Sequence, residues 1–222
     1  MVGNIANFTK IDLLRCLLRI EKPVSRAFLS KSLELGEGTI RSILDILKSK
    51  GYIESNNIGH YLSKTGIKFA EKIKDNITLK KIDGIPLFSN KKIVTIQIKN
   101  PAKIVNVVDL RDEAVKNGAE GALILKYDKK LRFYDSDYKE NLSEIEHRLK
   151  VSKNDLVIVA YADSYKLAEY GAISAAIRIN KDLMNALDML ENSDCAHSLL
   201  QRGVIDRNFR HAQKHVVFDK LK

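Results

Sequence analysis

The side chains with the clearest chemistry lie on one side of a predicted helix, residues 39–50. Its buried side is predicted by apolar residues at helical spacing: Ile40, Ile43, Leu44 and Leu47. The opposite side carries groups that can hydrogen-bond to base edges or bind phosphate oxygens: Thr39, Arg41, Ser42, Asp45, Lys48 and Ser49. This arrangement is typical of a helix that recognises the major groove of duplex DNA, although phosphates would repel Asp45.

Two predicted helices precede this segment and can position it. Thr9 and Ser25 have side chains that cap helices, and apolar residues follow each of them at helical spacing. Those residues are Ile11, Leu14 and Leu18 in the first helix and Phe28, Leu29 and Leu33 in the second. Pro23 ends the first helix, and Gly36 and Gly38 interrupt the chain before the third. We therefore expect three short helices that share one apolar core.

A short hairpin and a fourth helix are predicted after residue 50. Two strands are predicted over 52–55 and 60–63, and the Asn and Gly residues between them tolerate the positive φ angles of a tight turn. The fourth helix is predicted over 65–77. Around the hairpin lie side chains that we expect to contact the DNA backbone: Asn56, Asn57, His60 and Lys64.

The segments LSKSLELGEGTIRSILDILKSKGYI, residues 29–53, and YLSKTG, residues 61–66, make these elements similar to a known family. In sequence and in order, they resemble winged helix-turn-helix domains. The resemblance implies that the 39–50 helix enters the major groove and that the hairpin, the wing, contacts the DNA backbone. An alternative stays open, because winged helices also dock proteins and a polar helix face is by default only solvated surface.

The sequence composition favours a polyanionic binding partner and disfavours exported, membrane-spanning and disulfide-stabilised proteins. Lysine and arginine number 38 against 28 acidic residues, which gives a net charge of +10 and a pI near 9.4. The start of the chain lacks the features of an export signal, and the strongest apolar run, residues 156–162, is too short to span a membrane. The two cysteines are too few for a disulfide framework. We therefore expect a cytoplasmic protein with no membrane role and with double-stranded DNA as its partner.

The rest of the chain predicts a second domain that combines helices and strands. Strands are predicted over 93–98, 104–108, 121–127, 131–134 and 156–162, and helices over 110–117, 141–150, 165–179 and 183–190. This alternation favours an α/β domain with a mixed sheet, so the whole chain is α+β or mixed in class. The expected domains are a winged helix over 1–77, a lysine-rich seam or linker over 78–103, the α/β domain over 104–190 and an uncertain tail over 191–222.

Two stretches of this second domain are DLRDEAVKNGAEGALI, residues 109–124, and AYADSYKLAEYGAISAA, residues 160–176. They are similar to an uncharacterised domain that follows winged helices in archaeal proteins. The similarity implies the architecture of this domain and the role of a regulator, but it implies no chemical activity. A homodimer is expected of such a regulator. One helical surface consists of small residues, and tight packing on the sheet or a partner copy explains it at least as well as a cavity does: Gly171, Ala172, Ser174, Ala175 and Ala176.

The best candidate ligand site in this domain lies at the end of the predicted 156–162 strand. Asp163 and Ser164 stand at the start of the following helix, and Glu169 lies one and a half turns further on. Ligands of open α/β sheets gather at such strand ends, and free amides at a helix start can hold an anion, which Asp163 would repel. The alternative is that Ser164 or Asp163 only caps the helix.

Two further clusters are weaker candidates for chemistry. Asp109, Asp112 and Glu113 fall at one predicted helix start, where the helix dipole alone favours acidic residues, and we expect Asp109 to cap that helix. His211 and His215 have a spacing that a zinc ion could use, but the motif lacks further ligands. We therefore expect no metal, no cofactor and no catalytic residue.

Taken together, these features favour a DNA-binding transcriptional regulator that forms a homodimer. Its second domain would sense a small-molecule effector or mediate dimerisation. One alternative is a metabolic enzyme with a fused winged helix, which the missing nucleophile–base pair and phosphate loop disfavour. Another alternative is a scaffold in which the winged helix binds protein.

Overall fold

The computed structural model describes residues 8–88, 90–99, 101, 106–134, 136, 138 and 140–191. They form two compact units, the first within Met1–Ser63 and Met189–Lys222 and the second within Lys64–Asp188. The helix that follows the hairpin is grouped with the second unit, whereas the expected domain boundary came after it, at residue 77. Among the described residues, none of the helices has both the length and the apolar character that crossing a membrane requires.

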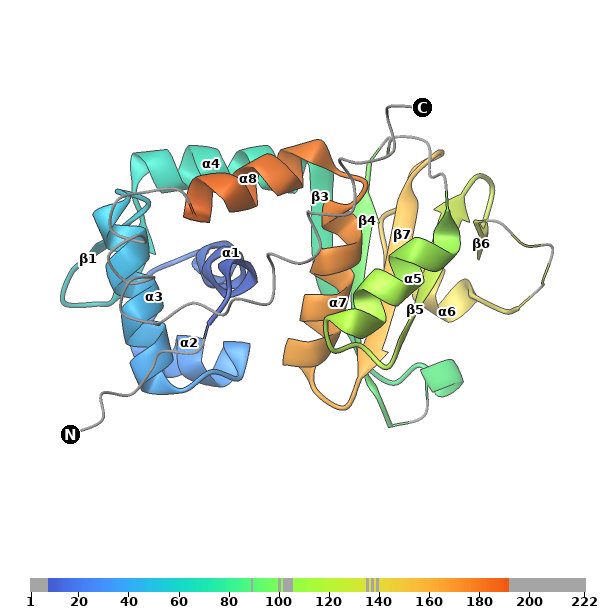
Figure 1. Cartoon of the computed structure of the whole chain (residues 1–222), viewed down its shortest axis with the longest axis horizontal. Helices are drawn as coiled ribbons and strands as arrows, with labels where there is room; N and C mark the ends of the chain where they lie inside the picture. Colours follow the sequence, from blue (N-terminus) through green and yellow to red (C-terminus); the bar gives the residue numbers. More distant parts are fainter. Residues whose placement is uncertain are drawn as a thin grey trace, which may run out of the picture. The chain divides into compact units, whose positions relative to one another are not determined.

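The first unit contains three helices followed by a two-stranded hairpin (Figure 1). Its elements are α1 (Lys10–Arg19), α2 (Arg26–Leu33), α3 (Glu37–Ser49), β1 (Ile53–Ser55) and β2 (His60–Leu62). The strands pair in antiparallel register, with Ile53 opposite Leu62 and Ser55 opposite His60. The three helices and the hairpin predicted for this region are therefore present, and in the predicted order.

Capping residues determine where these helices start. The Ser25 hydroxyl accepts a hydrogen bond from the Phe28 amide at 3.2 Å, and Thr9 is the N-cap residue of α1. The Ser25 cap is confirmed, and Thr9 occupies the predicted N-cap position, where its amide donates to Asp12 Oδ2 at 3.0 Å. Helix α3 begins at Glu37, two residues earlier than expected, because Gly36 adopts the extended backbone of an N-cap and Gly38 is accommodated in the first turn.

A buried ion pair within α1 is hydrogen-bonded to the end of α2. The Asp12 and Arg15 side chains are 0% and 1% exposed, and the distance from Asp12 Oδ1 to Arg15 Nη1 is 2.9 Å. Arg15 also donates from Nη2 to the Leu33 carbonyl at 3.0 Å, at the end of α2. Because a buried charge is tolerated only when it is paired and hydrogen-bonded, this network specifies how the two helices meet.

The predicted core face of α2 was wrong at one position. Phe28 is 50% exposed, whereas Leu29 and Leu33 are fully buried. Residues 29 and 33 are four apart and share one face, while residue 28 is displaced by about 100° around the helix. Phe28 therefore belongs to the surface of the first unit.

The second unit is built on a five-stranded sheet with the order β3-β4-β7-β5-β6. Its elements are α4 (Lys64–Asn76), β3 (Ile77–Ile82), the 3-10 helix η1 (Pro86–Phe88), β4 (Lys92–Ile98), α5 (Val107–Lys116), β5 (Gly121–Tyr127), β6 (Leu131–Phe133), α6 (Ser143–His147), β7 (Leu156–Ala162), α7 (Tyr165–Ile177) and most of α8 (Lys181–Glu191), whose last three residues are grouped with the first unit. Every pair of neighbouring strands is antiparallel. The expectation of a mixed sheet was therefore wrong, although the α+β class is correct.

A split crossover explains this difference. Strand β4, helix α5 and strand β5 follow one another along the chain, and β5 runs in the same direction as β4. Strand β7 lies between them and is antiparallel to both. The alternation of strands and helices predicted the crossover, but it carries no signal for the strand that inserts into it.

Residues 78–103 were expected to be a basic seam or linker with one strand near its end, over 93–98. They instead supply β4, which that strand predicted, and nearly all of β3, which was missed. Strand β3 pairs with β4 from Ile77 opposite Ile98 to Ile82 opposite Ile93. Strand β4 also pairs with β7 and is buried from Ile93 to Ile98. The described lysines of this stretch lie on the edge strand and at the ends of β4, so a basic segment can still belong to a sheet: Lys80, Lys81, Lys91, Lys92 and Lys99.

Three local predictions in this unit also need correction. The described part of 104–108 is not a strand, because Val107 and Val108 open α5. The cap of α5 is Asn106, whose Oδ1 accepts from the Val108 amide at 2.9 Å, so Asp109 stands in the first turn and does not cap. Helix α6 covers only part of 141–150, because the chain turns after it to enter β7.

The two faces of the sheet are covered differently. Helices α5 and α7 pack on one face, against β4, β5 and β7 (Figure 1). The other face carries an apolar cluster that includes residues of η1 and α6: Ile82, Ile85, Phe88, Ile93, Leu125, Leu131, Leu142, Ile145, Val157 and Val159. Alternate residues of the central strands therefore serve two separate cores.

The small residues of α7 allow it to approach α5 closely. A Cβ atom at Gly171 would lie 2.5 Å from Ala119 Cβ and 2.9 Å from the Ala114 carbonyl oxygen. We expect Gly171→Ala to lower the free energy of unfolding by about 1–3 kcal/mol, because the extra methyl group overpacks this contact. Urea denaturation followed by circular dichroism measures the change.

Gly38→Ala is the control, since a Cβ atom there meets nothing within 4 Å. This substitution should be neutral, or should stabilise the chain by up to about 1 kcal/mol, because alanine is the better helix former. Equal stability of the two variants would contradict the tight packing of α7 on α5.

Candidate nucleic-acid interface

Helix α3 buries one side and exposes the other, as its sequence predicted. The buried residues are Ile40, Ile43, Leu44, Ile46 and Leu47. Arg41, Asp45 and Lys48 are exposed, while Thr39 and Ser42 are half-buried at the margin. The solvent side of this helix therefore presents two cations and one carboxylate.

The two cations on this side keep their charges available. Neither Arg41 nor Lys48 forms an ion pair with another described residue. By contrast, the Ser42 hydroxyl donates to the Gly38 carbonyl at 3.3 Å, so its donor is already used within the helix. Arg41 and Lys48 are therefore the groups on α3 best able to bind an external anion.

The hairpin is fixed to the helices of the first unit through Val24. The Val24 amide donates to the His60 carbonyl at 2.9 Å, and the His60 amide donates to the Val24 carbonyl at 2.8 Å. At the tip, Asn56 Oδ1 accepts from the amides of Ile58 at 2.8 Å and Gly59 at 3.1 Å. The tip is therefore an ordered turn held by an Asn side chain.

The turn presents Asn57 and Ile58 to solvent, and Ile58 is 75% exposed. Asn56, expected to contact the DNA backbone, has its acceptor inside the turn and keeps only its amide donors for an external group. Lys64, also expected to contact the DNA backbone, is the first residue of α4, where the second unit begins. Its contact with DNA stays a prediction.

His60, on the hairpin, is influenced electrostatically by charged residues of two helices. Its Nδ1 lies 2.8 Å from Ser55 Oγ. Burial lowers the pKa of His60, the positive charges of Lys48 and Arg26 lower it further, and Asp45 opposes them. The ring is therefore neutral near physiological pH. We name the following residues the α3–hairpin surface: Arg26, Arg41, Asp45, Lys48, Asn57, Ile58 and His60.

Arg26 is the charged member of this surface that sequence reasoning missed. It is the first residue of α2, and its Nη2 lies 3.4 Å from Glu37 Oε2 at the start of α3. An exposed pair of this kind contributes little stability and can be exchanged for a phosphate contact. Its effect on His60 arises from the fold, and no local pattern in the sequence connects the two residues.

The three residues expected to form a ligand site at the end of β7 do not converge. Ser164 caps α7 by accepting from the Leu167 amide at 3.2 Å. Asp163 is exposed, and Lys91 at 2.8 Å holds the pKa of this carboxyl below its usual range. Glu169 is fully buried, 3.9 Å from the ammonium group of a lysine on β3. Because the neighbours of β7 are antiparallel to it, their carboxyl ends lie at the other end of the sheet.

Other candidates for chemistry are weak within the described ranges. No three His, Cys, Asp or Glu side chains there gather as a metal site would need. His211 and His215, with the spacing that zinc could use, lie outside the described residues. Cys16 is buried in α1, and burial raises the pKa of its thiol to about 12, so the thiol stays protonated.

The hairpin turn depends on glycine at position 59. Gly59 has a φ of +151°, and a Cβ atom there would lie 2.4 Å from the Val24 carbonyl oxygen. We expect Gly59→Ala to separate the hairpin from Val24, because backbone atoms at this distance cannot move aside cheaply. Hydrogen exchange should therefore accelerate at the Val24 and His60 amides.

Gly51→Ala provides the comparison for backbone strain alone. Gly51 also has a positive φ, +72°, but a Cβ atom there meets nothing within 4 Å. We expect this variant to lose about 1–2 kcal/mol of stability and to keep the slow exchange of the Val24 and His60 amides. Unchanged exchange at these two amides in Gly59→Ala would show that the contact with Val24 does not hold the hairpin.

Comparisons with known proteins match two separate parts of the chain. Residues 9–68 match the family model described as PH0730-like, N-terminal domain, and residues 88–179 match the one described as domain of unknown function (DUF4443). None of the curated proteins compared with the chain matches it. The solved structure of the hypothetical protein PH0730 from Pyrococcus horikoshii OT3 is similar, with a TM-score of 0.68 and 25% sequence identity over 81% of this chain and 99% of that one. The expected similarity to archaeal proteins is confirmed to this extent: the chain matches both family models and resembles this Pyrococcus protein in fold.

Proposed function

We propose that the first unit is a winged helix-turn-helix domain that binds duplex DNA, and that the protein is a transcriptional regulator. The observation that carries this proposal is the exposed side of α3, where Arg41 and Lys48 have no carboxylate partner among the described residues. The net charge of +10 supports it, because phosphate neutralisation supplies much of the affinity for DNA.

The order of the elements supports the assignment of a winged helix. Helices α2 and α3 are joined by a short turn that starts at Glu34 in the left-handed conformation, and the hairpin follows α3. Val24, between α1 and α2, pairs with the second hairpin strand. In such a domain the second helix of the pair enters the major groove. Helix α3 takes that role in our proposal, and the hairpin is the wing.

Each polar or charged member of the α3–hairpin surface then has a chemical role. Arg41 can donate two hydrogen bonds to a guanine edge, and Asp45 can accept one from a cytosine amino group. Lys48 and Arg26 bind phosphates on either side of the groove. Asn57 and His60 contact the backbone from the wing. The combination gives both a sequence-specific and a salt-dependent part of the binding.

The second unit has a supporting role in this proposal. It mediates a homodimer, which would match a two-fold symmetric operator, or it senses a small-molecule effector. Binding of protein in place of DNA is the second candidate function of the first unit. Two exposed apolar side chains favour it, Phe28 on α2 and Ile58 on the hairpin, since surface apolar groups often mark protein contacts.

The central test measures binding of the whole chain to duplexes selected from random DNA, by fluorescence anisotropy at several salt concentrations. We expect log affinity to fall linearly with log salt. Lys48→Gln should reduce the slope by about one, because it removes one phosphate contact. Arg41→Ala should weaken the preferred duplex by about tenfold to a hundredfold and relax the preference at one base pair.

Lys129→Gln is the matched control, because it removes the same charge from an exposed turn of the second unit. It should leave both the affinity and the slope as in the unmodified chain. A response to salt that is flat on every duplex, or equal losses in all three variants, would contradict DNA recognition by α3. Capture of a protein partner that requires Phe28 and Ile58 would then favour the docking function.

Affinity for DNA should also depend on pH through His60. The free ring has a lowered pKa, and a bound phosphate would raise it again, so binding takes up a proton. We therefore expect affinity to increase as the pH falls from about 8 to about 6. His60→Gln should remove most of this dependence, while Ser55→Ala should keep it. The same pH profile in the unmodified chain and in His60→Gln would exclude contact of this ring with phosphate.

A further inference from the structure

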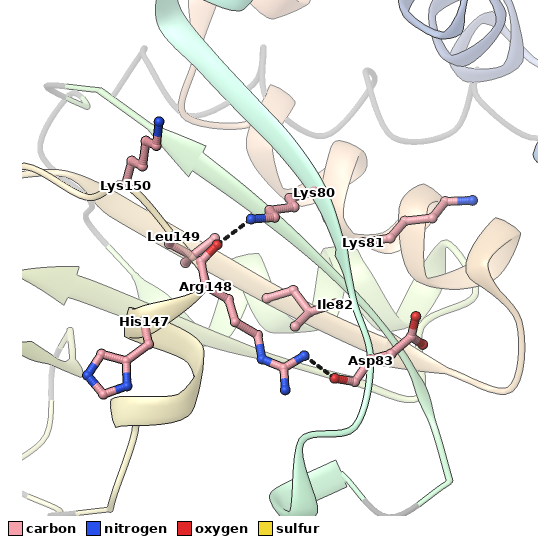
Figure 2. A pocket seen from close by; sticks show the side chains of 8 residues that line it. All are labelled: Lys80, Lys81, Ile82, Asp83, His147, Arg148, Leu149 and Lys150. Carbon is pink, nitrogen blue, oxygen red and sulfur yellow. Dashed lines mark hydrogen bonds between the residues drawn. The ribbon is translucent and has the colours of Figure 1, made fainter.

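A basic cavity of about 480 Å³ lies within the second unit (Figure 2). One wall is the edge strand β3 with the residue after it, and the other wall is the end of α6 with the chain that follows. The residues that line it are Lys80, Lys81, Ile82, Asp83, His147, Arg148, Leu149 and Lys150. Sites for small molecules in proteins typically measure about 300–1,000 Å³, so this cavity is large enough for one.

Two cations of the cavity are held by neutral partners. The Lys80 ammonium group donates to the Arg148 carbonyl, and the Arg148 guanidinium donates to the Asp83 carbonyl (Figure 2). Neither cation forms an ion pair with a carboxylate among the described residues, and Lys150 forms none either. A carbonyl orients a cation without neutralising it, so three positive charges remain uncompensated.

The acidic group on the lining interacts with other partners. The Asp83 carboxylate accepts a hydrogen bond from the Tyr165 hydroxyl and lies 4.0 Å from Lys92 Nζ. Lys81 points to the opposite side of β3 (Figure 2), where its ammonium group lies 3.9 Å from Glu169. Alternate residues of a strand face opposite sides, which explains why the two adjacent lysines separate. The charge in the cavity is therefore positive.

Buried polar side chains hold the second wall in place. Gln97 Nε2 on β4 donates to the Lys150 carbonyl at 2.8 Å and to Asp155 Oδ2 at 2.6 Å. Asp155 also accepts from the Ser152 amide at 2.7 Å. Gln97 and Asp155 are 4% and 3% exposed, so both are part of the interior. The backbone from which Lys150 projects is therefore fixed by the fold, so a ligand that binds here does not have to order this wall.

We propose that this cavity binds a small phosphorylated ligand. Phosphate oxygens match ammonium and guanidinium groups, and Arg148 uses only one of its five N–H donors for Asp83. Protection of a sheet edge accounts for a lysine on β3, but not for Arg148 and Lys150, which lie outside the strand. Every residue of the site belongs to the second unit, so the proposal does not depend on DNA binding by the first.

The test is isothermal titration calorimetry of the whole chain with inorganic pyrophosphate and with AMP, at low ionic strength. We expect saturable binding of at least one of these probes at one site per chain. Lys150→Gln is the first variant, because the Lys150 side chain is exposed and forms no hydrogen bond or ion pair with another described residue. We expect this variant and Lys80→Gln each to weaken binding by about tenfold, the effect of losing one charge-assisted hydrogen bond.

The control is the double variant Lys116→Gln with Lys181→Gln, which removes two exposed charges of the second unit outside the cavity. It should bind the probe as the unmodified chain does, and so should Arg41→Ala. Equal weakening in the control would assign the effect to overall charge and overturn the proposal. Two other results would also overturn it. One is that neither probe binds saturably. The other is that Lys150→Gln weakens the binding of duplex DNA but not that of either probe.

Discussion

Burial of one side of α3 is the constraint from which the DNA-binding account follows. Five apolar side chains of this helix are buried, and each contributes about 1.5–3 kcal/mol that exposure would forfeit. The opposite side must then face solvent, and that side carries Arg41, Asp45 and Lys48. The buried pair of Asp12 and Arg15 adds to this constraint, because it fixes the end of α2 from which the turn into α3 departs.

Local sequence patterns predicted most elements of the fold but not the pairing of its strands. Helices α1 to α4, the hairpin, β5, β6 and β7 follow from apolar spacing and turn residues, and the caps at Ser25 and Ser164 follow from side-chain chemistry. Which strands are neighbours is a non-local property, so the insertion of β7 between β4 and β5 carried no signal. For the same reason a lysine-rich stretch was assigned to a linker, although both ends of β3 and all of β4 after Lys92 are buried in the sheet.

Local sequence patterns likewise predicted some residues of the candidate sites and missed those that only the fold brings together. The exposed face of α3 could be predicted, because the helical spacing of its apolar residues leaves the polar residues on the opposite side. Arg26 could not, because its influence on His60 requires the hairpin to lie beside two helices. The basic cavity was missed because β3 and the end of α6 are far apart in the sequence, although the density of lysines near Lys80 was visible.

The most direct measurement is hydrogen–deuterium exchange of the whole chain with and without a selected duplex. A helix that enters a groove and a wing that contacts the backbone exclude solvent from their own amides and slow local opening. We expect the slowing of exchange to concentrate in residues 37–62, which span α3 and the hairpin. Slowing confined to the second unit, with residues 37–62 unchanged, would contradict the account.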